Sequence, residues 1–333
     1  MKDVRVGVLG ATGAVGREMM NILEERNFPV SELRPLASAH SAGREMKFRG
    51  ESVFVRQATP ESFRGLDIVL GAAEADIARQ FAPDILAAGA VFVDNSSAFR
   101  LQPEVPLVVP EINAGDVAWH SGIISNPNCS TIITLVAVKG INRLSTIKNM
   151  VASTYQAVSG AGAGGIAELA QQMQALSAGE PLVSKIFPYQ IAQNLIPRIG
   201  GFTANGYTAE EMKLLNEGRK IMHLPGMRVT CTCVRVPVVR SHSISVSVYT
   251  ERDLSVEEVR AQLALEDGVV LVDDPAAERY PMPLETSGQD KVFVGRIRKD
   301  MAFDNGIALW CCGDQVRKGA ATNTVQIAEL LLK

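Results

Sequence analysis

The chain opens with a short apolar strand that runs directly into a glycine-rich turn and an amphipathic helix. Residues 4–9 (VRVGVL) form the predicted strand, and residues 10–16 (GATGAVG) place three glycines at GxxGxxG spacing. Beyond this turn, apolar side chains recur at near-helical spacing from Val15 to Leu23. A strand, a glycine turn and a helix in this order are typical of the first unit of a dinucleotide-binding fold. The amino-terminal part of the chain is therefore predicted to be α/β.

Alternation of strands and helices continues through this part of the chain. Further apolar strands are predicted at 33–37, 67–72 and 90–93, with a helix over 75–89. Strands that alternate with helices indicate a Rossmann-type, doubly wound parallel sheet.

The character of the sequence changes near Asn126. Helices are predicted over about 130–142 and 166–178, with a Gly/Ala-rich loop at 160–165, a polar Pro/Gly-rich span at 179–206, long strands within 227–250 and a final helix within 314–332. We expect residues 1–125 and 314–333 to form the dinucleotide-binding domain. Residues 126–313 are expected to form an α+β domain with a mostly antiparallel sheet.

Composition restricts the partners and the compartment. The 333 residues include 33 basic and 36 acidic side chains, and this near-zero balance predicts a small-molecule partner rather than nucleic acid or an anionic membrane. The amino-terminal segment is unlike the apolar core of a signal peptide, and no stretch approaches the roughly 18 consecutive apolar residues of a membrane span, so we expect neither element. The five cysteines lack zinc-ligand spacing, so we expect no metal site and reduced thiols in the cytoplasm.

The glycine turn predicts where a pyrophosphate would bind. Backbone amides at the turn and the positive end of the following helix can hold this group, and glycines allow it to approach the backbone closely. An ordinary tight turn is the alternative. The predicted contacts are Gly10, Thr12, Gly13, Ala14 and Val15.

The end of the second strand bears on the choice of dinucleotide. Here Ser38, His40 and Ser41 stand where an acid would grip a ribose 2′-hydroxyl, and Glu32 lies too early in the strand to do so. Hydroxyls, an imidazole and free amides favour a 2′-phosphate, so NADP is expected rather than NAD. A merely polar loop is the alternative.

One cysteine stands at the start of a predicted helix. Cys129 lies in SNPNCST, directly before the helical segment TIITLVAVKGI. A helix amino terminus stabilises a thiolate and supplies amide donors to an oxyanion, which is what a thioester-forming nucleophile needs. The other cysteines lie in apolar, strand-like surroundings and are expected to be packing residues. These are Cys231, Cys233, Cys311 and Cys312.

Eight segments in order along the chain together resemble the aspartate-β-semialdehyde dehydrogenase family. They are GATGAVG, SAHSAG, DNSSAFR, SNPNCST, STYQAVSGAG, EEMK, RVPVVRSHS and DQVRKGAATN. The resemblance implies an enzyme that converts L-aspartyl 4-phosphate to L-aspartate 4-semialdehyde with NADPH, in the biosynthesis of lysine (through diaminopimelate), threonine and methionine. It also implies a homodimer or a tetramer made of two dimers, built through the second domain.

The resemblance assigns roles to single residues. Cys129 would form the thioester, His242 would be the general acid and base, and Gln156 would orient the acyl group. Arg235 would bind the substrate carboxylate and Glu210 its ammonium group. The phosphate ligands would be Arg100, Lys213 and Asn128.

The resemblance also implies cofactor contacts nearer the nicotinamide. These are Ser159, Gly160 and Gln315. Gln315 stands where many relatives have asparagine, and His40 stands where arginine is common. The second departure would let NAD compete with NADP.

Spacing tests some of these assignments. Thr208 and Glu211 are spaced as a capping box, which leaves Glu210 and Lys213 on one helix face. Arg235 and His242 are seven residues apart, an odd offset that sends side chains of one regular strand to opposite faces.

A bend near Pro237 would reconcile the roles of Arg235 and His242. Without it, Arg240 is the rival carboxylate ligand. Two alternative functions remain at this point: an N-acetyl-glutamyl-phosphate reductase, which has no use for an ammonium-binding Glu210, and a non-catalytic NADP-binding paralogue.

Overall fold

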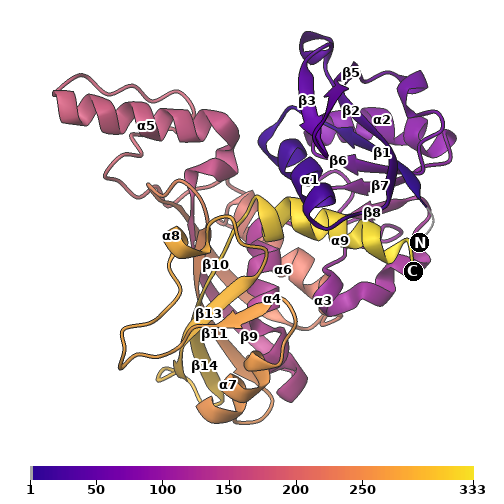
Figure 1. The fold of residues 1–333 in the computed structure, drawn as a ribbon. Helices are drawn as coiled ribbons and strands as arrows, with labels where there is room; N and C mark the ends of the chain where they lie inside the picture. Colours follow the sequence, from indigo (N-terminus) through magenta and orange to yellow (C-terminus); the bar gives the residue numbers. More distant parts are fainter. Residues whose placement is uncertain (1–2) are drawn as a thin grey trace. The chain divides into compact units, whose positions relative to one another are not determined.

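The computed structural model describes residues 3–333, which form two compact units (Figure 1). The first unit reaches from the amino terminus to Asn128 and takes in Ala320–Lys333; the second is Cys129–Gly319. The boundaries expected from the sequence, 125/126 and 313/314, lie a few residues before these crossings. Among residues 3–333, no helix is long and apolar enough to cross a membrane.

The first unit contains a six-stranded sheet in which every neighbouring pair is parallel. Its strand order is β5-β2-β1-β6-β7-β8, with β1 in the middle, as expected for a doubly wound fold. A separate antiparallel hairpin, β3 with β4, was not predicted. The strands are β1 (Val4–Leu9), β2 (Val30–Ala37), β3 (Glu45–Phe48), β4 (Glu51–Phe54), β5 (Arg56–Gln57), β6 (Ile68–Gly71), β7 (Val91–Asp94) and β8 (Ile123–Ser125).

Two apolar cores lie in this unit. Val6 and Val8 of β1 belong to a core that includes residues of helices α1 and α9, whereas Leu9 belongs to another that includes residues of α2. The carboxy-terminal helix α9 is part of this unit, and an ion pair joins its Glu329 to Arg26, the residue directly after α1. The helical elements are α1 (Ala14–Glu25), α2 (Ala75–Ala87), α3 (Pro110–Asn113), α9 (Thr322–Leu330) and the 3-10 turns η1 (Ala39–Ser41), η2 (Pro60–Phe63) and η3 (Ala114–Trp119).

The second unit contains a mixed sheet with the order β10-β9-β11-β14-β13-β12. Three neighbouring pairs are antiparallel, while β9 with β10 and β12 with β13 are parallel. A mostly antiparallel second sheet is thereby confirmed. The strands are β9 (Ile147–Gln156), β10 (Arg228–Arg235), β11 (His242–Thr250), β12 (Val269–Leu271), β13 (Val292–Lys299) and β14 (Gly306–Gly313).

One face of this sheet is covered by helix α4, whose residues from Ser130 to Ile141 are all buried. A Cβ built on Gly313 of β14 would point at Ile133 of α4, so the covered face is the one on which a side chain at position 313 would lie. On the opposite face Val151 is exposed, and Tyr155, Ser245 and Trp310 are half-buried. We call these four residues the open face.

The helices of the second unit are α4 (Cys129–Leu144), α5 (Gly162–Ala178), α6 (Ala209–Ile221), α7 (Val256–Ala264) and α8 (Pro283–Thr286). A 3-10 turn, η4 (Val158–Ala161), and a π-helical turn, η5 (Arg317–Ala321), complete the set. The chain returns to the first unit along η5.

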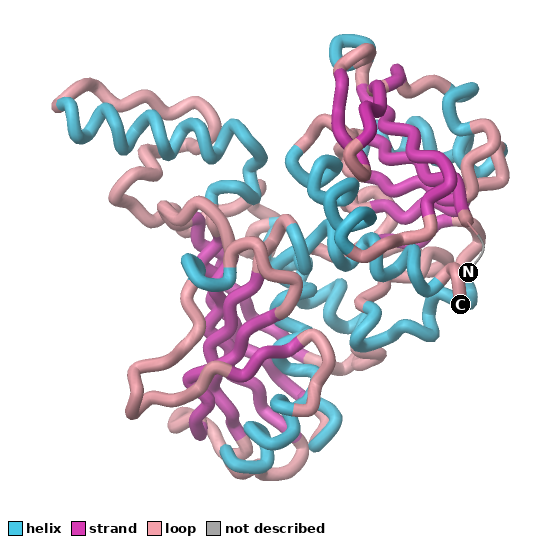
Figure 2. The backbone as a smooth tube through the Cα atoms, viewed as in Figure 1, coloured by secondary structure: helices cyan, strands magenta, loops and turns pink. Residues whose placement is uncertain are grey.

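Helix α5 begins earlier than the sequence suggested. The segment 160–165 is not a loop, because α5 starts at Gly162. Gly165 is needed for close packing, since a Cβ there would lie 2.4 Å from the carbonyl oxygen of Val158. The tube in Figure 2 shows α5 followed by a long irregular segment, which Glu168 anchors by accepting backbone bonds from Lys185 and Ile186.

Candidate functional site

The glycine turn forms a cavity in the first unit. Helix α1 begins at Ala14 without a side-chain cap, so its first amides face the turn. Gly10 has φ +86°, and a Cβ there would lie 2.8 Å from the backbone of Ala72. A cavity of about 460 Å³ adjoins the turn. Its lining residues are Leu9, Gly10, Thr12, Gly13, Ala37, Ser38, Ala39, Gln57, Ala58, Ala72, Ala73, Glu74, Ile77, Gln80 and Phe81.

These features fit a dinucleotide, because the uncapped helix end and the glycine backbone offer amide donors next to an open space. Gly10, Thr12, Gly13 and Ser38 line the cavity, whereas His40 lies in turn η1 and is exposed. Glu32 is ion-paired with Arg34 at 2.6 Å and does not line the cavity.

The predicted contacts Ala14 and Val15 are the first residues of helix α1. Ser41 lies beside His40 in η1 but is buried. None of these three residues is among those that line the cavity.

Two predicted phosphate ligands also lie in the first unit. Arg100 is buried and donates from Nε to the carbonyl oxygen of Asn126 and from a terminal nitrogen to that of Asn95, both at 2.9 Å. Asn128 is buried and directly precedes Cys129. Both bonds tie the guanidinium of Arg100 to the backbone at Asn95 and Asn126.

Cys129 is the first residue of α4, as predicted, and is half-buried. Its Sγ lies 3.5 Å from Nε2 of His242, the first residue of β11. The nucleophile and the base expected from the sequence are therefore in hydrogen-bond contact.

His242 is completely buried, and its protonation is restricted by its neighbours. Burial, with the charge of Arg235 as the second cause, lowers the pKa of His242 to about 3. Its Nδ1 accepts a 3.0 Å bond from the backbone N–H of Ala157. Since Nδ1 is an acceptor, the proton of the neutral ring is assigned to Nε2, the nitrogen that faces Cys129.

Charged and amide side chains surround this pair. Arg235, at the end of β10, donates to the carbonyl oxygen of Ala157 at 2.7 Å, and burial lowers its pKa. Gln156, at the end of β9, donates to Glu210 at 3.2 Å. Lys213 is ion-paired with the same Glu210 at 2.7 Å. The second unit thus brings together Cys129, His242, Gln156, Arg235, Glu210 and Lys213.

The chain between Arg235 and His242 bends more than a bulge would. Strand β10 ends at Arg235 on one side of β9, and β11 begins at His242 on the other side. Pro237 lies in the connection. The odd offset of seven residues therefore does not send Arg235 and His242 to opposite faces of one strand, because the two residues belong to different strands. Arg240 forms a 2.5 Å ion pair with Asp314.

The expected contacts Ser159, Gly160 and Gln315 also lie in the second unit. The Gln315 amide bonds the hydroxyl of Ser159 and accepts the backbone N–H of Ser241 at 2.9 Å. Gly160 leaves space at the site, because a Cβ there would lie 2.9 Å from a terminal nitrogen of Arg235.

Two residues of the site were missed. Ala157 holds both Arg235 and His242 through its backbone, and no side-chain pattern could reveal this. Asp314 accepts backbone bonds from Val316 and Arg317. An aspartate that bonds amides two and three residues ahead is a local signal that could have been used.

The remaining cysteines are all buried, as predicted. Cys231 and Cys233 lie on one strand with sulfurs 3.7 Å apart. Burial raises the pKa of Cys312 to about 11 and raises that of Cys311 as well. The thiols of Cys311 and Cys312 are therefore unsuited to nucleophilic chemistry.

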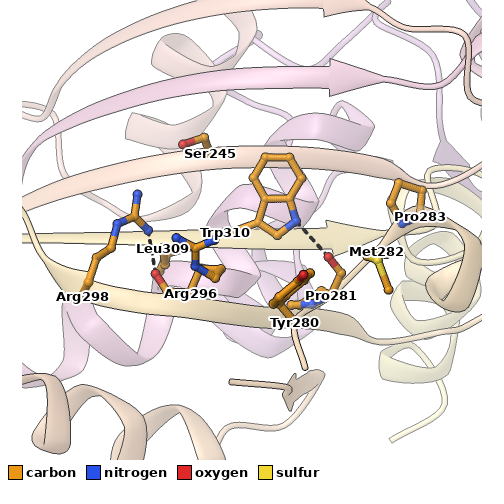
Figure 3. A pocket seen from close by; sticks show the side chains of 9 residues that line it. All are labelled: Ser245, Tyr280, Pro281, Met282, Pro283, Arg296, Arg298, Leu309 and Trp310. Atoms are coloured by element: carbon orange, nitrogen blue, oxygen red, sulfur yellow. Dashed lines mark hydrogen bonds between the residues drawn. The ribbon is translucent and has the colours of Figure 1, made fainter. Parts of the chain in front are cut away.

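A second cavity of about 330 Å³ lies on the open-face side of the second unit (Figure 3). Trp310 lines it and donates from its indole nitrogen to the carbonyl oxygen of Pro281 at 3.0 Å. No predicted site residue lines this cavity, so it is separate from the Cys129 site.

Comparison with known proteins identifies the family. Residues 5–120 match the family described as semialdehyde dehydrogenase, NAD binding domain, and residues 138–318 match semialdehyde dehydrogenase, dimerisation domain. Aspartate-semialdehyde dehydrogenase of Aquifex aeolicus is 50% identical over 333 residues, which cover 99% of this chain and 98% of that protein. The chain belongs to the aspartate-semialdehyde dehydrogenase family. Its relative from Synechocystis sp. is 48% identical over 99% of this chain and 98% of that protein.

A solved structure agrees with this membership of the aspartate-semialdehyde dehydrogenase family. The crystal structure of aspartate semialdehyde dehydrogenase II from Vibrio cholerae superposes with a TM-score of 0.97, at 44% identity and 99% coverage of both chains. The same enzyme has been solved complexed with ASA, with a TM-score of 0.97, 44% identity and coverage of 100% and 99%. The chain is thus an oxidoreductase with a dimerisation domain, and the acetylglutamyl-phosphate reductase alternative is not favoured.

Proposed function

We propose that this protein converts L-aspartyl 4-phosphate and NADPH to L-aspartate 4-semialdehyde, phosphate and NADP through a thioester on Cys129. The observation that carries the proposal is the 3.5 Å approach of Cys129 Sγ to His242 Nε2, beside Arg235 and Glu210. The reaction consumes one proton, which leaves with the phosphate. Its product would enter the biosynthesis of lysine, threonine and methionine.

The thiolate of Cys129 attacks the acyl carbon, so that an S–C bond forms and the bond from carbon to the phosphate oxygen breaks. Two features support the thiolate: the amino end of α4 and the Nε2–H of His242. As negative charge develops on the acyl oxygen, the same Nε2–H can donate to it. His242 therefore holds its proton at the atom that faces the reacting centre.

Binding of the aspartyl group falls to the residues around Cys129. The guanidinium of Arg235 can pair with the α-carboxylate through two parallel bonds, because its planar fork matches a carboxylate. Glu210 can accept the α-ammonium, and Gln156, already bonded to Glu210, can orient the acyl chain. Lys213, Arg100 and Asn128 are proposed as phosphate ligands.

Reduction of the thioester needs a hydride, which the cofactor would supply when bound; the resulting hemithioacetal then collapses, its C–S bond breaks, and the semialdehyde leaves as the thiolate of Cys129 is restored. Gly10, Thr12, Gly13, Ala14 and Val15 would hold the pyrophosphate at the start of α1. The 2′-phosphate would lie near Ser38, His40 and Ser41, which is why NADP is proposed over NAD. Ser159, Gly160 and Gln315 are proposed contacts near the nicotinamide. An aspartate semialdehyde dehydrogenase of Candida albicans, whose chain shares this fold at 24% identity, was solved with NADP.

The dimer is proposed to form through the open face (Val151, Tyr155, Ser245 and Trp310). These residues lie within the segment that matches the dimerisation domain. A dimer of dimers is the larger assembly that we propose. None of the five cysteines, all of which lie within residues 3–333, forms a disulfide, which supports a reducing compartment such as the cytoplasm.

The experiment is the reverse reaction, in which purified protein, L-aspartate 4-semialdehyde, phosphate and NADP should produce NADPH absorbance. Cys129→Ala should abolish turnover, and retained turnover would falsify the nucleophile assignment. N-acetyl-glutamate semialdehyde in the same assay tests the rival activity, because acylation removes the charge that Glu210 would bind. Replacing NADP by NAD tests the cofactor assignment.

A further inference from the structure

Gly319 lies against the nucleophile of the second unit. A Cβ built on Gly319 would lie 2.8 Å from Cβ of Cys129 and 3.3 Å from its Cα. Carbon atoms in protein interiors approach to about 3.5 to 4.0 Å, so alanine does not fit here without displacement. Gly319 is not among the glycines with positive φ. Space, rather than backbone conformation, is therefore what requires glycine.

The turn that carries Gly319 is firmly held. Gly319 lies in the π-helical turn η5 and donates its backbone N–H to the carbonyl oxygen of Asp314 at 3.0 Å. The Asp314 carboxylate is fully buried and also accepts the backbone N–H of Gly288 at 2.6 Å and the Nε of Arg240 at 2.5 Å. Turns of this π type occur frequently at functional sites. The turn is thus a fixed support for Cys129.

The same segment also holds the partner of the nucleophile. Gln315, next to Asp314, accepts the backbone N–H of Ser241, the residue before His242. Ser241 has φ +72°, a strained conformation for a residue with a side chain. Residues 314–319 therefore contact the chain at Cys129 and directly before His242.

We propose that Gly319 is a positioning residue that fixes the Cβ of Cys129, so that Sγ stays within reach of His242 Nε2. This inference rests on the proposed function only in taking Cys129 as the nucleophile. The segment 314–319 sets both sides of the 3.5 Å contact from Sγ to Nε2. Because reacting groups tolerate little displacement, with about 10²-fold loss for a 1 Å error, the absence of one methyl group has a large effect on rate.

The first test is Gly319→Ala in the full chain. We expect kcat to fall about 10²-fold with little change in the KM of the semialdehyde, since the residues that bind substrate are untouched. The rate at which iodoacetamide alkylates Cys129 should fall in parallel. This probe reads Cys129 because the other four thiols are buried. Rates are divided by the fraction of folded protein.

Two glycines of the same unit serve as matched controls. Gly201 and Gly226 are exposed, have no atom within 4 Å of a built Cβ and have no positive φ. Gly201→Ala and Gly226→Ala should leave kcat and alkylation within about twofold of the parent, because surface substitutions of this kind change little. If all three variants behave alike, the positioning role is wrong.

The second test does not depend on activity. In a Cys129→Gly background the clashing Cβ is gone, so Gly319→Ala should lower the Tm by less than half as much as it does in the parent. An equal loss of Tm in both backgrounds would overturn the proposed contact. Failure of the proposed function would appear instead as turnover in Cys129→Ala, and it would leave this cycle readable.

Discussion

Replacing His242 by asparagine should make the stability of the protein less sensitive to acid. His242 is buried as a neutral ring whose pKa lies at about 3, against an ordinary value of 6.5. The unfolded chain therefore binds a proton at pH values where the folded chain does not. Stability from this residue is fully present above pH 6.5 and is lost as the pH falls from 6.5 toward 3.

The size of this effect follows from the two pKa values. A pH of about 5 is roughly 1.5 units below the pKa of the imidazole in the unfolded chain, and each unit corresponds to about 1.36 kcal/mol. The free energy of unfolding is therefore about 2 kcal/mol lower at pH 5 than at pH 8. In a domain of about 200 residues this corresponds to roughly 4 to 8 °C in Tm. His242→Asn lacks this component.

Thermal unfolding at about pH 8 and pH 5 measures the effect. The fall in Tm between the two pH values should be smaller in His242→Asn than in the parent by the amount above. His223 provides a matched control, because it is exposed and has φ +54°, a conformation that asparagine accepts. His223→Asn should fall in Tm as the parent does. An identical fall in the parent and in His242→Asn would refute the buried neutral imidazole.

Three further predictions concern the same unit. Arg235→Lys should lower kcat/KM about 10²-fold, mainly through KM, because lysine lacks the planar guanidinium that pairs with a carboxylate. Arg240→Lys should have the smaller effect in the same kinetic assay. If Arg240→Lys has the larger effect, Arg240 is the carboxylate ligand. Gly160→Ala should raise KM by about tenfold as its Cβ displaces Arg235, and an unchanged KM would contradict that contact. Lys139→Met should reduce the free energy of unfolding, measured by urea titration, by about 3 kcal/mol. The reason is that Nζ of the buried Lys139 lies 3.1 Å from a carboxylate oxygen of Glu266. A loss below about 1 kcal/mol would count against a stabilising ion pair between these two residues.

Features that depend on a few neighbouring residues were predicted well. Thr208 and Glu211 form the expected capping box, with bonds of 2.7 and 3.3 Å. Cys129 stands at a helix start because the apolar run that follows it is unmistakably helical. Propensity, capping and period act within one or two turns of chain, so a single sequence contains them.

Features that depend on strand pairing were not predicted. Arg235 and His242 meet because their strands flank β9, and β9 itself was not identified from the sequence. The high content of Val, Ser and Thr in residues 227–250 predicted strands but does not indicate which strands pair with one another. The backbone role of Ala157 likewise arises only after three strands are assembled.

The contact between Cys129 and Gly319 has a further consequence, because these are the first and last residues of the second unit. In the first unit, Asn126 and Asn323 also bond each other across the two ends of that unit, at 2.7 Å. Each unit therefore has its two chain ends together, which is the geometry that tolerates domain insertion. The second unit thus interrupts the first at one point of the chain, and Cys129, the proposed nucleophile, is the first residue after that junction.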